Sequence, residues 1–178
     1  SILSLSLMFS GRARLVLGTA QSLDIAREAW NKSVAYAESS PAARKLVKDV
    51  RRANGEQCLT IDNGSRYRIA ATSRGAGRGL SVDLLILDEL REHRDWDAWA
   101  ALSATTTARP NSLTVGISNA GDSSSVVLNT LRAAALAGDD PTLGLFEWSA
   151  PDGCALDDPD AWVACNPSLG YLITEQTL

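Results

Sequence analysis

Apolar residues along the chain fall into two patterns, short unbroken runs and longer stretches with helical spacing. A strand buried on both faces of a parallel sheet carries no polar position, whereas a helix that covers the sheet is apolar on one face only. The alternation of the two patterns predicts an α/β fold with a mostly parallel central sheet flanked by helices. We expect buried strands at residues 14–18, 84–87, 113–117 and 143–148.

Helices are predicted between these strands. Residues 2–9 are apolar and lack a basic start, so we expect a core helix there rather than a secretory signal. Ser22 can cap the next helix, in which apolar residues recur at helical spacing. Asp122 or Ser123 can cap a later helix, and Gly138 is placed to end it.

A further helix is predicted to begin at Ser40, with Pro41 in its first turn. One face of this helix is apolar and consists of Ala43, Leu46, Val47 and Val50. The other positions are basic and consist of Arg44, Lys45, Lys48, Arg51 and Arg52. These basic residues are possible contacts for DNA phosphates, although a solvated outer face has the same composition.

Shorter elements complete the prediction. Residues 57–61 and 66–72 are expected to be strands, because the tight-turn sequence Asp62-Asn63-Gly64 lies between them. Trp96 and Trp99 indicate a short helix that packs back on the sheet rather than a base-stacking surface. Residues 160–165 form one or two helical turns before Asn166-Pro167.

Composition excludes several classes of function. No apolar run approaches the roughly 18 residues that a membrane helix needs, so we expect no membrane partner. The three cysteines are scattered without a CxxC pair, and His93 is the only histidine, which argues against a zinc site. We interpret the cysteines as reduced and structural, and His93 as a surface residue.

Charge is distributed unevenly around a net charge of −4. Residues 1–132 hold all 17 lysines and arginines against 13 acids, whereas residues 133–178 hold 8 acids and no base. Pro, Asp and Gly also become frequent after residue 150. We therefore predict a working domain at residues 1–150 and an acidic linker at residues 151–178.

The strongest candidate chemistry follows the aliphatic run at residues 84–87, which ends in Asp88-Glu89. The carboxyl end of a central parallel strand opens at the ligand crevice of the sheet. An aspartate there can hold Mg²⁺, and an adjacent glutamate can orient and deprotonate the water that attacks a γ-phosphate. Ser118 and Asn119 follow the next strand, where polar side chains can sense that phosphate, although an ordinary turn also favours these residues.

The loop at residues 74–79 is basic and rich in glycine. It resembles a phosphate loop only superficially, because no Gly-Lys dipeptide occurs in the chain. Arg78 is the more interesting residue, since an arginine in such a loop can reach a neighbouring subunit's nucleotide. An arginine solvated in a turn is the alternative.

Taken in order, these segments resemble the ATPase domain of the large terminase subunit of tailed bacteriophages. The matching segments are residues 15–21 with 26–30, 78–80 ahead of 84–89, 117–121, and the linker-like residues 162–170, where Cys165 stands in an alanine position. The resemblance implies an additional-strand, RecA-like P-loop ATPase fold that is incomplete at the N-terminus. It also implies a pentameric ring in the host cytoplasm that drives double-stranded DNA into a procapsid with the portal and the small terminase subunit.

The resemblance implies roles for the candidate residues, with ATP and Mg²⁺ as substrate and cofactor. Asp88 would bind Mg²⁺, Glu89 would activate water, and Arg78 would act across subunits. Ser118 and Asn119 match the motif that couples hydrolysis to movement.

Two departures from the family are evident. The lysine-bearing phosphate loop is expected before residue 1 and the nuclease after residue 178, so we interpret the chain as a fragment that binds ATP weakly and hydrolyses it negligibly by itself. One alternative is a non-catalytic module, derived from a degenerate P-loop ATPase, that binds DNA or packaging partners. A helicase-type relative is the other, but it has no need of the linker at Asn166-Pro167.

Overall fold

The computed structural model describes residues 1–72 and 77–177. Contacts between residues divide the chain into two compact units, Ser1–Leu131 and Arg132–Leu178, which are described separately below. The functional boundary expected at residue 150 stays a prediction.

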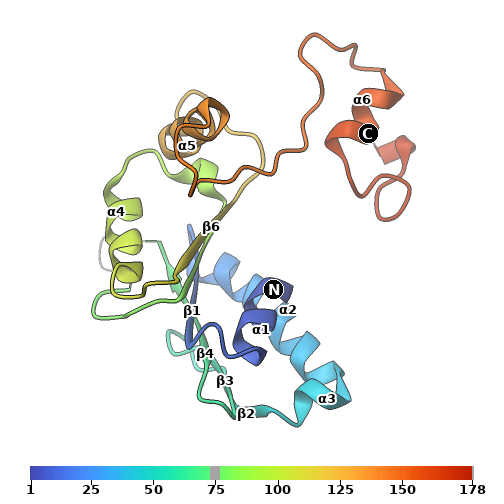
Figure 1. The fold of residues 1–178 in the computed structure, drawn as a ribbon. Coiled ribbons are helices and arrows are strands. Elements are labelled where there is room, and N and C mark those ends of the chain that lie inside the picture. The colour runs from blue at the N-terminus through green and yellow to red at the C-terminus, as the bar shows by residue number, and fades with distance from the viewer. Residues whose placement is uncertain (73–76, 178) are drawn as a thin grey trace. The chain divides into compact units, whose positions relative to one another are not determined.

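A six-stranded sheet forms the centre of the first unit (Figure 1). Its strands are β1 (Leu15–Ala20), β2 (Val47–Arg51), β3 (Cys58–Ile61), β4 (Arg66–Ala71), β5 (Leu84–Asp88) and β6 (Leu113–Ile117). They lie in the order β2-β3-β4-β1-β5-β6. The four strands from β4 to β6 are parallel, and β2 and β3 form an antiparallel edge. The predicted mostly parallel α/β sheet is therefore confirmed.

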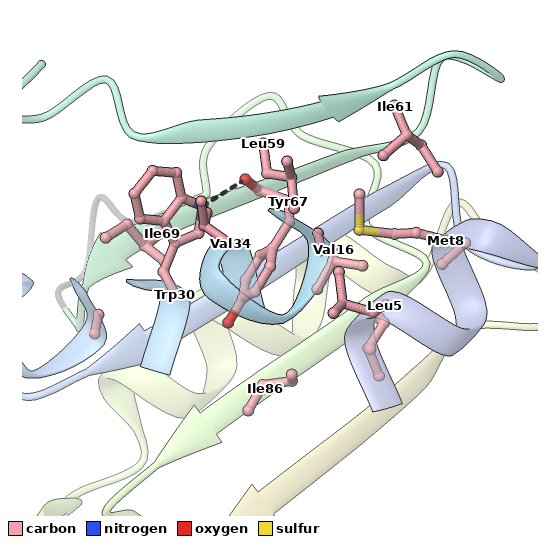
Figure 2. Packing of buried hydrophobic residues seen from close by; sticks show 14 of the residues in the cluster. Leu5, Met8, Val16, Trp30, Val34, Leu59, Ile61, Tyr67, Ile69 and Ile86 are labelled. Atoms are coloured by element: carbon pink, nitrogen blue, oxygen red, sulfur yellow. Dashed lines mark hydrogen bonds between the residues drawn. The ribbon is translucent and has the colours of Figure 1, made fainter. Parts of the chain in front are cut away.

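Helices α1 (Ile2–Phe9) and α2 (Leu23–Ser39) contribute to the larger of two buried apolar clusters. Trp30 of α2 is 1% exposed, and its indole Nε1 donates to the carbonyl oxygen of Tyr67 over 3.3 Å (Figure 2). Burial raises the pKa of the Tyr67 hydroxyl to about 12. Gly18 of β1 makes room for this ring, because a Cβ at Gly18 would lie 2.8 Å from the Tyr67 hydroxyl.

The second cluster lies on the opposite face of the sheet. Side chains alternate between the two faces of a strand, so Val16 and Ile86 belong to the first cluster while Leu17 and Leu87 belong to the second. Leu102 of α4 (Asp97–Ser103) also belongs to the second cluster. This two-sided burial explains why β1 and β5 read as unbroken apolar runs.

The turn between β3 and β4 has the predicted form. Gly64 has a φ of +85°, a left-handed conformation that glycine adopts without steric cost. Asn63 holds the turn in two ways: its Oδ1 accepts from the backbone N–H of Ser65 over 2.8 Å, and its Nδ2 donates to the Met8 carbonyl oxygen over 2.9 Å. The turn thus joins the hairpin to the end of α1.

The prediction of a long basic helix that begins at Ser40 is wrong. Only the four-residue helix α3 (Pro41–Arg44) forms, capped by Ser40, and β2 follows it. The pairing of β2 with β3 shifts by one residue between Val47 and Asp49, so Val47 and Val50 both face the first cluster. An apolar spacing of three residues therefore comes from a bulged strand, which imitates the spacing of a helix.

Strand β6 forms at the predicted residues but is not buried as predicted. It pairs only with β5 at one edge of the sheet, and Leu113 and Ile117 are 46% and 50% exposed. The last predicted strand, residues 143–148, is wrong, because these residues form neither a strand nor a helix.

Helix α5 (Val126–Ala137) ends at Gly138 as predicted, with a φ of +72° at that glycine. It begins at Val126, three residues later than a cap at Asp122 implies and two later than a cap at Ser123 implies.

The second unit contains the end of α5 and the short helix α6 (Pro159–Cys165), which Asp158 caps and which ends before Asn166 as predicted. Its clearest ionic contact joins Arg132 to Glu147 through two hydrogen bonds of 2.7 and 2.8 Å. All three cysteines are free. Across the described residues, none of the helices combines the length and the apolar character needed to cross a membrane.

Candidate functional site

Strand β5 carries Asp88 to the carboxyl edge of the parallel sheet. Its first four residues are buried, and Asp88 is the first to be partly exposed. Inside the sheet, the Thr19 hydroxyl of β1 donates to the carbonyl oxygen of Ile86 over 3.1 Å. The aspartate therefore lies at the end of a rigid strand, at the edge where ligands bind in open α/β sheets.

Glu89 has an unusual backbone conformation. With φ 55° and ψ 52°, it is the one residue other than glycine with a positive φ in the described part of the chain. A side chain in the left-handed region is strained, and such strain gathers at functional sites. The backbone N–H of Glu89 donates to Oδ1 of Asp88 over 3.1 Å, so the two acidic residues are joined at this turn.

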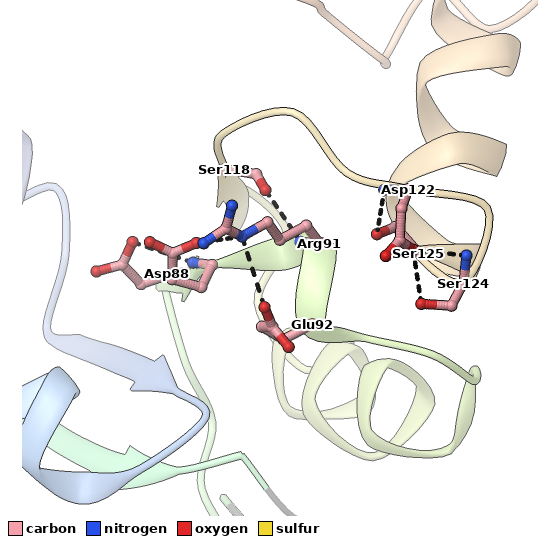
Figure 3. Close-up of polar contacts among 8 residues, drawn as sticks. Asp88, Arg91, Glu92, Ser118, Asp122, Ser124 and Ser125 are labelled. Atoms are coloured by element: carbon pink, nitrogen blue, oxygen red, sulfur yellow. Dashed lines mark hydrogen bonds and ion pairs between the residues drawn. The ribbon is translucent and has the colours of Figure 1, made fainter.

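Arg91 follows in the 3-10 turn η1 (Leu90–Glu92) and contacts two carboxylates (Figure 3). Its Nε lies 3.0 Å from Oε2 of Glu89 and 3.5 Å from Oε1 of Glu92. The Nε and Oε2 atoms are both buried and lack hydrogen-bond geometry, so the first contact is a charge pair rather than an aligned hydrogen bond. The sequence pattern does not single out this arginine, because its contact depends on the left-handed turn at Glu89.

Ser118 joins this group from β6. Its Oγ accepts a hydrogen bond of 3.0 Å from the backbone N–H of Arg91. Asn119, the other predicted sensing residue, is exposed, and its side chain makes no hydrogen bond with the described residues. The structure thus brings Asp88, Glu89 and Ser118 to one edge of the sheet through the segment around Arg91.

A second polar turn begins α5 (Figure 3). Oδ1 of Asp122 accepts from the backbone N–H of Ser124 over 2.7 Å and from its hydroxyl over 2.6 Å. The hydrogen bond from the Ser124 hydroxyl is the main cause that lowers the pKa of Asp122 below its usual value. The Asp122 N–H donates to the Ser125 hydroxyl over 3.1 Å, so backbone and carboxylate of Asp122 both hold this turn.

The beginning of α1 lies near Asp88. The Asp88 carboxylate lies close enough to Ser1 to act on it electrostatically. The Ser1 hydroxyl donates to the Ala29 carbonyl oxygen of α2 over 3.0 Å.

Arg78 is exposed in the turn at residues 77–79 and does not join the Asp88 group. The neighbouring Gly79 lines a cavity of about 340 Å³ with Leu15 and Arg66, at the amino ends of β1 and β4. Asp88 lies at the carboxyl end of β5, which is parallel to β1. The other arginine of this loop, Arg74, lies outside the described residues.

The five basic residues proposed as DNA contacts do not share a helix face. Arg44 ends α3, Lys45 caps it, and Lys48 and Arg51 lie in the edge strand β2. Arg51 lies 3.6 Å from Glu56, and Arg52 contacts Glu38 at 3.2 Å, so two of the five charges are paired. Their contact with DNA stays a prediction, without the helical surface that suggested it.

His93 is buried rather than exposed as predicted, with 6% of its surface accessible. Burial lowers the pKa of its imidazole, and Asp95 partly opposes the shift. Trp96 and Trp99 contact each other edge to face, with ring centres 6.1 Å apart. Trp99 packs against the second cluster as predicted, whereas Trp96 is 39% exposed.

This sheet, with its flanking helices and an Asp-Glu pair at the end of a central strand, has the fold of the ATPase-type domain of large terminases. The comparison that shows it is with the crystal structure of the HK97 bacteriophage large terminase, with a TM-score of 0.81 at 22% identity over 92% of this chain and 34% of that chain. The large terminase subunit of Enterobacteria phage HK97 is also similar in sequence, with 23% identity over 165 residues.

These residues amount to 92% of this chain and 32% of that protein, so the chain spans about a third of the length of its relative. No family model matches the chain. The resemblance to the large terminase subunit that the ordered segments indicated is confirmed by both comparisons.

Proposed function

We propose that this chain is the ATPase segment of a large terminase subunit, the motor that drives DNA packaging in a bacteriophage. The observation that carries the proposal is the Asp88-Glu89 pair at the carboxyl end of β5, in a chain similar to a large terminase over 92% of its length. Asp88 is the Mg²⁺ ligand in this proposal and Glu89 is the base that activates water.

The residues at this edge fit a magnesium site of the nucleotide-bound kind. The described residues contain no group of three or more histidine, cysteine or acidic side chains that could hold a metal by themselves. Mg²⁺ commonly binds one or two carboxylates and completes its shell with water and substrate phosphates, where it neutralises developing charge. A single partly exposed Asp88 suits that arrangement, with ATP as the substrate.

Glu89 has a position suited to a base. Its side chain is about 30% exposed, so water can reach it, and the rigid strand before it fixes its place relative to Asp88. Such a group contributes by holding the attacking water and accepting its proton in the transition state. Ser118 and Asn119, at the end of the adjacent strand, are proposed to couple phosphate sensing to movement.

The wider assembly belongs to the same proposal. It consists of a ring of five subunits, with double-stranded DNA, the portal and the small terminase subunit as partners. Exposed Arg78 lies away from the Asp88 group of its own chain, which supports a role toward a neighbouring subunit's nucleotide. The chain alone lacks a lysine-bearing phosphate loop, so we expect weak ATP binding and negligible hydrolysis from residues 1–178.

The test is Glu89→Gln in a large terminase subunit that contains this chain with its flanking sequence. We expect ATP hydrolysis to fall on the order of 100-fold to 10,000-fold, because the base is lost, while nucleotide binding is retained. Glu28→Gln, an equivalent change at an exposed position of α2, is the control and should leave hydrolysis unchanged. Hydrolysis that survives Glu89→Gln would contradict the base assignment. Micromolar ATP affinity with multiple turnover by residues 1–178 would contradict the expected inactivity of the isolated chain.

A further inference from the structure

Arg91 contacts both the Glu89 carboxylate and the residue that follows β6. Its guanidinium lies 3.0 Å from the Glu89 carboxylate, and its backbone N–H donates to Ser118 over 3.0 Å. The arginine thus connects the predicted base with the predicted sensing residue through two separate groups (Figure 3).

The charge pair between Arg91 and Glu89 differs from an ordinary surface ion pair. A solvent-exposed pair contributes little, because water screens it and both side chains lose freedom. Here the two contacting atoms, Nε and Oε2, are buried although about a third of each side chain is accessible. The lower local dielectric strengthens the attraction and restricts the directions that the carboxylate can adopt.

The contact with Arg91 restrains the side chain of Glu89. The backbone of Glu89 is in the left-handed region, where a residue with a side chain is strained. The hydrogen bond from its N–H to Asp88 fixes the backbone but leaves the carboxylate free to rotate. Of the two carboxylates around Arg91, Glu89 is the nearer to the Nε atom, by 3.0 Å against 3.5 Å for Glu92.

The turn that carries Arg91 is also fixed to β6 at a second point. Leu90 is 5% exposed and packs on Gly116, since a Cβ at Gly116 would lie 2.7 Å from its Cδ2 atom. Gly116 and Ser118 therefore hold consecutive residues of the turn, one by packing and one by a hydrogen bond. A displacement of the end of β6 has to move Arg91 with it.

We propose that Arg91 is a positioning residue that orients Glu89 and transmits the position of Ser118 to it. This inference rests on the proposed function, because it assigns Arg91 to the reaction in which Glu89 is the base. Arg91 does not touch the reacting atoms; it sets where the carboxylate stands and makes that position depend on β6.

The experiment uses the same large terminase subunit with Arg91→Ala, Arg91→Gln and Arg91→Lys. We expect kcat for ATP hydrolysis to fall on the order of 10-fold to 100-fold in the alanine and glutamine variants, because a small misplacement of a catalytic group has such an effect. KM for ATP should stay within about twofold of the wild type, since nucleotide binding is untouched. Lysine should restore part of kcat, because it keeps the charge without the planar fork. Arg94→Ala, at an exposed arginine of the same segment, is the matched control.

A double-mutant cycle tests the link to β6. Ser118→Ala should lower kcat several-fold in the wild type and by less than about twofold in the Arg91→Ala background, because coupled residues give non-additive effects. Equal effects of Ser118→Ala in both backgrounds would overturn the transmission through Arg91.

The outcomes separate this inference from the function on which it rests. Loss of hydrolysis in Glu89→Gln together with wild-type kcat in Arg91→Ala and Arg91→Gln overturns the role of Arg91 alone. A raised KM with unchanged kcat in these variants also overturns it, because it assigns Arg91 to nucleotide binding. Hydrolysis that persists in Glu89→Gln overturns the proposed base and the positioning role together. If Arg91→Ala does not fold, the glutamine and lysine variants decide by the same criteria.

Discussion

The two units of the chain are stabilised by different kinds of interaction. Ser1–Leu131 is built on two apolar clusters that bury side chains on both faces of its sheet. In Arg132–Leu178, the described residues include a single buried apolar side chain, Ala161, while Phe146 and Leu156 are 86% and 96% exposed. The first unit depends on contacts between residues distant in sequence, and burial of this kind is the main favourable contribution to folding.

The second unit is held mainly by polar contacts between residues close in sequence. The Trp162 indole donates to the Leu156 carbonyl oxygen over 2.8 Å, and Asp140 accepts from the backbone and the hydroxyl of Thr142. Contacts of this kind define turns and helix ends but exclude little apolar surface from water. A side chain of one type therefore contributes differently to the free energy of unfolding in the two units, and substitutions test this directly.

The largest expected effect comes from Trp30→Ala in the first unit. Trp30 is 1% exposed and its indole is hydrogen-bonded to the backbone of β4, so the substitution leaves a cavity and removes this hydrogen bond. We expect the free energy of unfolding to fall by about 3–5 kcal/mol. Trp148→Ala in the second unit, where the residue is 60% exposed, should change the free energy of unfolding by less than about 0.5 kcal/mol. Urea unfolding followed by circular dichroism measures both changes. Equal effects would show that buried apolar side chains do not distinguish the first unit from the second.

A smaller effect is expected from Asp83→Ala, which removes polar contacts between residues of the first unit that are distant in sequence. Oδ2 of Asp83 accepts from the backbone N–H groups of Arg14 and Leu15 over 2.9 and 2.8 Å, and Oδ1 lies 3.4 Å from the Arg109 guanidinium. Its side chain is 14% exposed. We expect a loss of about 2–3 kcal/mol, because hydrogen bonds to a charged group at the start of a central strand are lost.

Two controls sharpen this prediction. Asp83→Asn keeps an acceptor oxygen and should cost less than alanine, whereas Asp49→Ala, at an exposed position of β2, should have almost no effect. If Asp83→Ala were as mild as Asp49→Ala in thermal unfolding, then long-range polar contacts would not distinguish the first unit from the second.

The sequence predicted the central strands because burial on both faces leaves an unbroken aliphatic run. It did not predict that β6 lies at an edge, because an edge strand and a central strand have the same apolar residues when the neighbour is unknown. It mistook β2 for a helix because the bulge places Val47 and Val50 on one face at a spacing of three. Residues 143–148 have the composition of a strand, but no strand pairs with them in the described structure.

The candidate site was predictable in part for a related reason. Asp88 and Glu89 were predicted because an aliphatic strand ends at them, and Ser118 because it follows the next strand. Since these two strands pair in parallel, their carboxyl ends lie at the same edge of the sheet. Arg91 was not predictable, because its contact requires a left-handed residue at position 89, which is rare outside glycine. His93 is buried by tertiary packing around η1, for which the local sequence offers no signal.

The smallest expected effect is local to the second unit and concerns the Glu147 carboxylate. Hydrogen bonds from Arg132, followed by one of 2.9 Å from the Ser149 hydroxyl, lower the pKa of Glu147 from 4.5 to about 2. Because the pKa is lowered in the folded chain, the stabilisation is present above pH 4.5 and is lost as the pH falls from 4.5 toward 2. Arg132→Ala should return the carboxyl titration, followed by carbon NMR, toward pH 4.5.

Two further variants serve as controls for the pKa of Glu147. Ser149→Ala should raise the pKa of Glu147 by a smaller amount than Arg132→Ala, because its hydrogen bond is the second cause of the shift. Arg12→Ala, at an exposed position of the first unit, should leave the Glu147 titration unchanged. We expect neither Arg132→Ala nor Ser149→Ala to approach the effect of Trp30→Ala on unfolding, because an exposed ion pair buries little apolar surface. An effect of similar size would mean that the polar contacts of the second unit stabilise the chain as strongly as the buried core of the first.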